Sequence, residues 1–136
     1  MYARCVNARA LVFPLCVMAS DDPPSVLPTV DDMREAVTER FGLIPCTWQL
    51  EAALTQLGQR DLLTLAPTGS GKTLTFWIPL LFNDDGVTIV VTPLTVLGEK
   101  NVNELSEISI AAINLTTTTA SDETFKVIHL YLNFVV

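Results

Sequence analysis

The sequence of 136 residues has few basic residues and no apolar run long enough to cross a membrane. Lysine and arginine together number 8, against 15 aspartates and glutamates, and the net charge is −7. Because proteins bind nucleic acids largely by neutralising backbone phosphates, this balance argues against strong DNA binding by the isolated chain. A membrane-spanning helix needs about 18 consecutive apolar residues, so the sequence predicts no membrane partner.

The cysteines and the single histidine form no recognisable metal site or disulfide framework. Cys5, Cys16 and Cys46 are odd in number and have no paired spacing. A reducing compartment is the simplest interpretation. His129 has no acidic residue or cysteine close to it in the sequence, so we expect it to have no metal-binding or catalytic role.

Residues 1–28 are expected to form a leader or linker ahead of a domain that covers residues 29–136. Arg4 and Arg9 precede an apolar stretch without acidic residues, a pattern typical of a weak targeting presequence. The competing interpretation is that translation starts at Met18 and that the preceding residues are a mis-assigned extension. A proline- and acid-rich stretch then indicates an extended linker.

Two helices are predicted at the start of the domain. Thr29 is suited to cap the first, with Asp32 three residues later as its reciprocal partner, and Gly42 follows its end. The second is expected at residues 48–57, with Gly58 ending it.

Residues 66–73, Ala-Pro-Thr-Gly-Ser-Gly-Lys-Thr, form a nearly complete phosphate-binding loop. Residues 61–65 before it are expected to form a short buried strand, and residues 74–82 after it an apolar helix. The glycines allow the backbone to wrap around an anion with successive N–H groups pointing inward. A helix N-terminus adds unpaired N–H groups and the positive end of its dipole. The pattern predicts a nucleoside-triphosphate site.

The chemistry of such a loop assigns a role to each of its last two residues. The ammonium group of Lys72 can reach the β- and γ-phosphates, and the Thr73 hydroxyl can ligate Mg²⁺. We therefore expect ATP and Mg²⁺ as cofactors, with Lys72 and Thr73 as candidate catalytic residues. The other candidate cofactor-binding residues of the loop are Ala66, which replaces the first glycine of the strict pattern, Pro67, Thr68, Gly69, Ser70 and Gly71.

Strands and helices are predicted to alternate through the rest of the chain. This order favours an α/β fold, a P-loop NTPase domain with a doubly wound parallel sheet and helices on both faces. The chain ends inside an apolar stretch, so we expect the domain to be cut short. Strands are expected at 87–91, 108–115 and 132–136, and helices from Thr92-Pro93 to about residue 107 and from Asp122, capped by Ser121.

Three blocks of residues resemble the first RecA-like motor domain of a RecQ-type ATP-dependent DNA helicase, in superfamily 2 with the DEAD/DEAH-like proteins. The blocks are Phe41-Gly42 with residues 48–52, similar to the adenine-recognition segment; residues 66–73 with 76–79, similar to motif I; and residues 90–94 with Leu97 and 101–102, similar to motif Ia in its RecQ form.

The resemblance implies a partial RecA-like domain from a family that couples ATP hydrolysis to 3'-5' DNA unwinding, usually in the nucleus. It implies that Gln49 recognises adenine, since a glutamine amide can donate and accept at once. It also implies contacts between motif Ia and DNA, for which the candidates are Thr92, Pro93 and Lys100.

The sequence departs from the family pattern in ways that leave enzymatic activity open. Leu43 and Cys46-Thr47 stand where an aromatic and a basic residue are usual, and no Asp-Glu-x-His box is present. The only late acidic pair, Asp122-Glu123, lies at a polar helix start. We therefore expect the chain alone to bind MgATP without appreciable hydrolysis.

Two further interpretations stay open. The chain is alternatively a non-enzymatic nucleotide-binding or partner-binding module, docking on a full-length helicase through an exposed sheet edge. A small P-loop kinase or GTPase is disfavoured, because the strand at 87–91 ends in Thr92-Pro93 rather than aspartate and no Asn-Lys-x-Asp motif is present.

Overall fold

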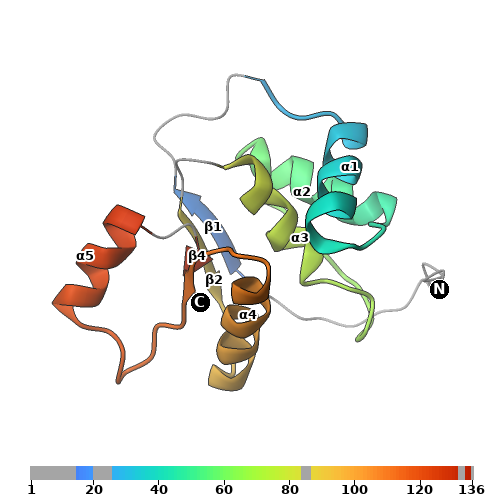
Figure 1. Ribbon diagram of the computed structural model, residues 1–136. Coiled ribbons are helices and arrows are strands. Elements are labelled where there is room, and N and C mark those ends of the chain that lie inside the picture. The colour runs from blue at the N-terminus through green and yellow to red at the C-terminus, as the bar shows by residue number, and fades with distance from the viewer. Residues whose placement is uncertain (1–14, 20–25, 84–86, 132–133, 136) are drawn as a thin grey trace. The chain divides into compact units, whose positions relative to one another are not determined.

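The computed structural model describes residues 15–19, 26–83, 87–131 and 134–135. The chain divides into two compact units. The described part of the first, residues 26–82, is called here the P-loop unit; that of the second, residues 15–19 with 83, 87–131 and 134–135, is called the sheet unit. Figure 1 shows the helices of the first and the strands of the second. None of the described helices is long and apolar enough to cross a membrane.

The P-loop unit is helical. Its elements are α1 (Val30–Phe41), α2 (Thr47–Leu57), α3 (Leu74–Trp77) and the 3-10 helix η1 (Ile78–Phe82). Their apolar faces meet in a core whose fully buried members are Met33, Val37, Leu50, Ala53 and Ile78. The rings of Phe41 and Trp77 pack in a tilted arrangement with centroids 5.9 Å apart. The two predicted helices at the start of the domain are therefore confirmed.

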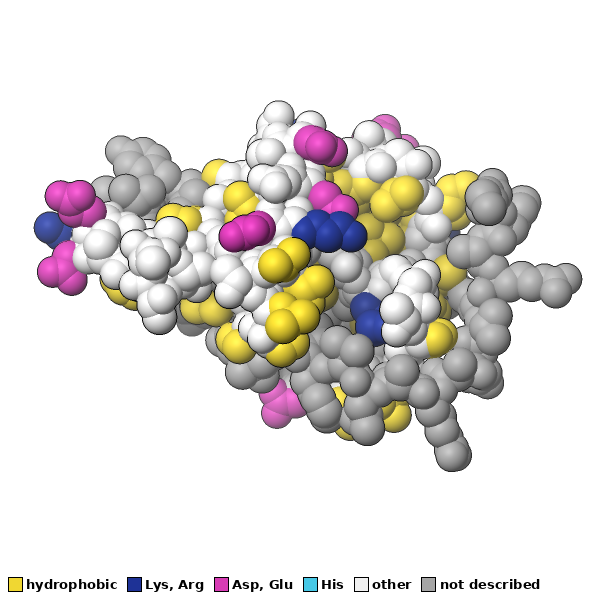
Figure 2. All heavy atoms as spheres, turned by 90° about the horizontal axis from the view of Figure 1, so that it is seen from below, with side chains coloured by type: hydrophobic (Ala, Val, Ile, Leu, Met, Phe, Trp, Pro, Cys, Tyr) yellow, Lys and Arg dark blue, Asp and Glu magenta, His cyan; other side chains and the backbone are white. Residues whose placement is uncertain are grey.

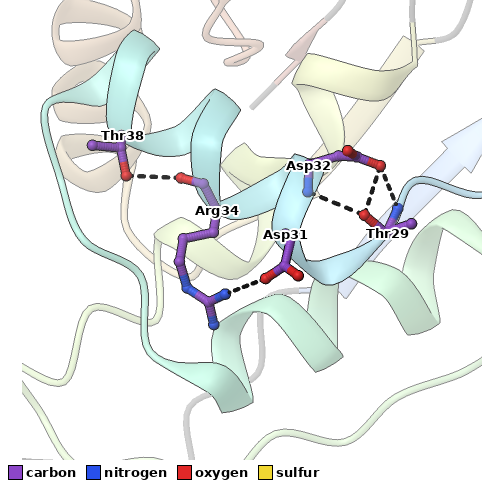
Figure 3. Close-up of polar contacts among 5 residues, drawn as sticks. All are labelled: Thr29, Asp31, Asp32, Arg34 and Thr38. Carbon is purple, nitrogen blue, oxygen red and sulfur yellow. Dashed lines mark hydrogen bonds and ion pairs between the residues drawn. The ribbon is translucent and has the colours of Figure 1, made fainter.

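The start of α1 is held by the predicted capping box (Figure 3). The Thr29 side chain accepts the N–H of Asp32 at 3.2 Å, and the Asp32 carboxylate accepts the backbone N–H of Thr29 at 3.0 Å. The Thr29 hydroxyl also donates to that carboxylate at 2.7 Å. These bonds lower the pKa of Asp32 below its usual value, the side-chain bond contributing most. At the other end, Gly42 caps the helix with φ of 64°.

The predicted helix after the phosphate-binding loop changes type at Ile78, one residue before Pro79. Proline has no N–H, so it cannot donate to the carbonyl of Thr75 four residues earlier. The Nε2 of Gln56 on α2 donates to that carbonyl instead, at 2.9 Å. Because the α-helical pattern stops here, residues 78–82 continue as a 3-10 helix.

The sheet unit contains four strands and two helices. The strands are β1 (Leu15–Ala19), β2 (Val87–Val91), β3 (Ala112–Ile113) and β4 (Phe134–Val135), and the helices are α4 (Thr95–Glu107) and α5 (Asp122–Tyr131). The sheet order is β1-β2-β4-β3, and Figure 1 labels the first three of these strands. β1 pairs antiparallel with β2, whereas β4 pairs parallel with both β2 and β3.

The strand predicted at 61–65 is not formed. Residues 61–67 have no regular structure, and Leu62, Leu63 and Leu65 are 45%, 62% and 54% exposed. An apolar segment becomes a buried strand only where neighbours pair with it, and the sheet of the described residues consists of four other strands. The parallel sheet with helices on both faces therefore stays a prediction.

Three other boundaries differ from expectation. The strand predicted at 108–115 shrinks to β3, because the N–H groups of Ile108, Ser109 and Ile110 bond to carbonyls at the end of α4. The helix expected to open at Pro93 begins two residues later, at Thr95. β1 lies inside residues 1–28, which were expected to form a leader or linker ahead of the domain.

Other predictions agree or lie outside the described residues. β2 forms as expected, and the Ser121 hydroxyl accepts the N–H of Thr124 in the first turn of α5. β4 lies within the predicted final strand, of which residues 132–133 and 136 are outside the described part. So are residues 1–14 and 20–25 of the predicted leader, with Cys5 among them.

Candidate nucleotide-binding site

The backbone of the loop turns at two glycines with positive φ. Gly69 has φ of 80° and Gly71 φ of 77°, values that residues with a Cβ rarely adopt. Between them the N–H of Ser70 donates to the carbonyl of Pro67 at 3.2 Å. A Cβ on Gly69 would meet no atom within 4 Å, so the backbone angle, not space, requires glycine there. The loop thus has the left-handed turns that its glycines predict.

Lys72 is held by carbonyls of its own loop. Its Nζ donates to the carbonyl of Ala66 at 2.9 Å and to that of Pro67 at 2.7 Å. An ammonium group has three hydrogens, and these two bonds use two of them. The half-buried lysine therefore keeps one donor for an anion beside the loop.

The hydroxyls of Thr73 and Ser70 are unoccupied within the part of the chain that the structure describes. Thr73 is the half-buried N-cap residue of α3, and its side chain makes no capping bond. The buried Oγ of Ser70 has no hydrogen-bond partner. An orphaned hydroxyl is costly unless a ligand or water pairs with it. These groups fit a ligand that offers oxygen atoms, as a triphosphate with Mg²⁺ does.

Gln49 lies against the loop. Its side chain is almost fully buried, with 5% of the residue exposed. The Nε2 donates to the carbonyl of Gly71 at 2.9 Å and to that of Ser70 at 3.3 Å, while the Oε1 accepts the N–H of Cys46 at 2.7 Å. The structure therefore brings the predicted adenine-recognition residue to the loop, with its amide occupied by the protein.

The remaining loop residues differ in exposure. Ala66 is buried, with 6% exposed, which leaves little room for a larger residue at the first position. Pro67 is half-buried, and Thr68 is exposed. All the residues from Ala66 to Thr73 belong to the P-loop unit, as does Gln49.

The candidate DNA contacts belong to the sheet unit. The Thr92 hydroxyl donates to the carbonyl of Leu94 at 3.2 Å, and Pro93 is exposed. The Nζ of Lys100 lies 3.6 Å from a carboxylate oxygen of Glu104, which offsets its charge. On the face that Figure 2 draws, acidic side chains are interspersed with basic ones, without a continuous basic stripe.

The sequence did not predict the role of Gln56, a side chain that positions α3, the helix after the loop. Gln56 binds the Thr75 carbonyl and so ties α2 to α3. The signal for it was Pro79, because a proline inside a predicted helix frees the carbonyl four residues earlier. No residue in the described part of the chain belongs to a cluster of three or more metal-ligating side chains.

Comparison with known proteins places this loop in a family. The family profile of the DEAD/DEAH box helicases matches residues 46–135, more than half of the chain. The ATP-dependent DNA helicase Q1 of Rattus norvegicus is 35% identical over 81 residues, which are 60% of this chain and 13% of that protein.

Two further relatives agree. The ATP-dependent DNA helicase RecQ of Synechocystis is 45% identical over 49 residues, 36% of this chain and 10% of that protein. The RecQ-like DNA helicase BLM of Xenopus laevis is 38% identical over 90 residues, 65% of this chain and 6% of that protein. The chain therefore spans a small part of these relatives. It belongs to the DEAD/DEAH box helicase family, on the RecQ-type side of that family.

Proposed function

We propose that this chain binds MgATP through the loop formed by residues 66–73, as part of a RecQ-type helicase motor domain. The observation that carries the proposal is the position of Lys72, whose ammonium group is fixed by two loop carbonyls with one donor left over. A cation anchored in this way beside two left-handed glycine turns is suited to a polyphosphate.

Each group of the loop has a role in this proposal. The Lys72 ammonium would neutralise the β- and γ-phosphates, and loop N–H groups would donate to phosphate oxygens. The Thr73 hydroxyl would be a ligand of the Mg²⁺, which supplies charge neutralisation of the phosphates when bound. The Ser70 hydroxyl would gain the partner that it lacks.

Hydrolysis is not part of what the chain does alone under this proposal. Attack on the γ-phosphate needs an acidic group that orients the water, and the sequence has no Asp-Glu-x-His box to supply it. The relatives carry the name ATP-dependent DNA helicase, and unwinding is proposed here only for a motor that includes such groups.

Isothermal titration of the 136-residue chain with MgATP tests the proposal. Lys72→Ala removes a charged donor to the phosphates, so we expect it to weaken binding about 10- to 100-fold. Lys126→Ala, which removes an exposed lysine from α5, is the matched control and should leave the affinity unchanged. Equal affinity of wild type and Lys72→Ala would refute binding at the loop.

Turnover is measured separately, by phosphate release with and without single-stranded DNA. We expect no release above background from wild type. DNA-stimulated release that disappears in Lys72→Ala would show that the chain is catalytic.

Contacts of Thr92, Pro93 and Lys100 with DNA, and a nuclear location, remain parts of the helicase proposal. Titration with DNA should show weak binding, because the chain is acidic.

A second candidate is a partner-binding module, favoured by the exposed leucines of the segment 61–65. Leu62, Leu63 and Leu65 are all at least 45% exposed in a segment without strand pairing. Exposed contiguous apolar side chains are typical of interaction surfaces. If the segment docks on a full-length RecQ-type helicase, Leu63→Asp should abolish co-sedimentation with the purified helicase, whereas Thr64→Asp should not. An equal change in co-sedimentation for the two variants would argue against docking through residues 61–65.

A further inference from the structure

We infer that two copies of this chain associate through the edge of β1 that faces away from β2. Each β1 pairs antiparallel with the β1 of the other copy, across a two-fold axis at Val17. The inference goes beyond the proposed function, because it concerns the sheet unit and needs no nucleotide. It rests on the place of β1 in the sheet, on its composition and on its length.

β1 is an edge strand of the sheet unit. In the order β1-β2-β4-β3, β2 is the one strand bonded to β1 among the residues that the structure describes (Figure 1). The two pair antiparallel from Leu15 opposite Val91 to Ala19 opposite Val87. In such a ladder, alternate residues direct their N–H and C=O groups to the neighbouring strand. The groups of the residues between them face the other side, where a further strand can pair with them.

β1 has none of the features that protect an edge strand from further pairing. Such edges are usually blunted by charged side chains, by proline or by a bulge. The sequence of β1 is Leu-Cys-Val-Met-Ala, and its register with β2 is continuous. β2, with the sequence Val-Thr-Ile-Val-Val, is uncharged as well. The charges that give each chain its net −7 therefore lie outside these two strands, and no like charges oppose pairing at the edge itself.

A second copy of the chain fits this edge. About a two-fold axis perpendicular to the sheet, a strand meets its own copy antiparallel, so the same residues serve on both sides. With the axis at Val17, Leu15 lies opposite Ala19 of the copy, and all five residues of β1 pair. The other edge strand, β3, has only two residues. Pairing of β1 with β3 of another copy would form fewer bonds and an open chain of molecules, so the closed dimer is favoured.

Sedimentation velocity of the 136-residue chain tests for the dimer. A pair of short strands buries less surface than the roughly 1,200–2,000 Å² of stable interfaces, so we expect a weak dimer, with a Kd of about 10–100 µM. The fraction of dimer should rise with concentration and no larger species should form. A chain that stays monomeric at several hundred micromolar, or that assembles without a discrete dimer, would overturn the inference.

Charge substitutions at Val17 locate the joint. Since the axis sets Val17 opposite its own copy, Val17→Lys brings two like charges together and should weaken the dimer about tenfold. Val17→Glu should do the same. An equimolar mixture of the two variants sets opposite charges across the axis, so it should recover most of the lost affinity. If both variants dimerise as wild type does, the joint lies elsewhere and the inference is refuted.

Hydrogen exchange of wild type gives a result that does not depend on the folding of any variant. Backbone pairing protects amides, so exchange within residues 15–19 should slow about tenfold between protein concentrations well below and well above the Kd. Residues 116–119, in a loop of the same unit, are the internal reference and should exchange at the same rate at both concentrations. Exchange of residues 15–19 that is independent of concentration would contradict pairing through β1.

Two control variants separate this joint from other causes of association. Thr117→Lys makes the same change of charge at an exposed loop position and should leave the dimer unchanged. An equal loss in Thr117→Lys would mean that net charge, not strand pairing, sets the association. Leu63→Asp should also leave the dimer unchanged, and its loss there would assign the contact to residues 61–65 instead. MgATP affinity is measured separately, so failure of the proposed function would not affect these results.

Discussion

The P-loop unit and the sheet unit differ in where their buried apolar side chains lie. Among the side chains whose burial the structure describes, all of the buried apolar ones belong to the P-loop unit except Val90 and Leu105. Large apolar side chains that are at least 39% exposed occur in both units; those of the sheet unit whose burial the structure describes are Ile89, Val91, Leu94, Val96, Leu97 and Phe125. The P-loop unit therefore has a core of its own.

The bonds that hold each unit span different lengths of chain. In the P-loop unit, Gln49 and Gln56 reach carbonyls 22 and 19 residues away. In the sheet unit, Leu15 pairs with Val91, so the strand ladder joins segments far apart in the sequence. Loops of such different length carry different closure entropies. We expect the P-loop unit to be the more stable of the two.

The largest predicted effect comes from truncating the core of the P-loop unit. Leu50 is fully buried, and Leu50→Ala should cost about 2–5 kcal/mol of unfolding free energy because it leaves a cavity. Hydrogen exchange should show the loss in α1 and α2. Leu105→Ala, at an equally buried position of α4, is the matched variant and should loosen α4 instead. If either variant loosens both units equally, they unfold as one.

A smaller effect is predicted for the bond that replaces the one missing at Pro79. Gln56→Ala leaves the Thr75 carbonyl without its side-chain partner and should cost about 1–3 kcal/mol in urea unfolding. Adding Pro79→Ala restores an N–H that can donate to this carbonyl, so the double variant should recover part of the loss. No recovery would mean that the cost of Gln56→Ala arises elsewhere in its packing.

In the sheet unit, the effect of Gly98→Ala on stability should change sign when the Asn114 side chain is removed. A Cβ on Gly98 would collide with the Asn114 amide, whose Nδ2 donates to the Thr95 carbonyl at 3.3 Å. Gly98→Ala should therefore destabilise the chain by about 1 kcal/mol or more. With Asn114→Ala as background, space is open, and alanine should stabilise α4 by about 0.5–1 kcal/mol relative to glycine. Additive effects in the double-variant cycle would refute the contact.

The features that the sequence predicted best are those that depend on residues close together in the chain. The Thr29 cap, the end of α1 at Gly42 and the glycine turns of the loop all depend on residues a few positions apart. The strand at 61–65 failed, because an apolar run reveals that a segment suits a strand but not which strands pair with it. β1 was missed for the same reason, since its partner lies more than seventy residues away, with Leu15 opposite Val91.

In the candidate site, too, the sequence predicted what depends on neighbouring residues and missed what depends on distant ones. The loop residues 66–73 followed from their pattern, whereas the contacts of Gln49 and Gln56 with carbonyls of the loop and of α3 did not. Which acceptor a glutamine on α2 reaches depends on how α2 packs against the segment that follows it. That packing is set by buried side chains such as Leu50 and Ile78, which a local pattern does not place in contact.

The smallest predicted effect is a pH dependence confined to the start of α1. Hydrogen bonds from Thr29 lower the pKa of Asp32 in the folded chain, so ionised Asp32 adds stability above the pKa of the unfolded chain. This contribution should be lost as the pH falls below about 4, through the lowered folded value. Thus wild type should be more stable than Asp32→Asn in urea at pH 7, and the difference should shrink as acid is added. Thr29→Ala removes the hydroxyl whose hydrogen bond to Asp32 contributes most to the lowered pKa. In that background the stability difference between Asp32 and the Asp32→Asn variant should be small at every pH. A difference that grows in acid would mean that the Asp32 carboxylate is not stabilised by this cap.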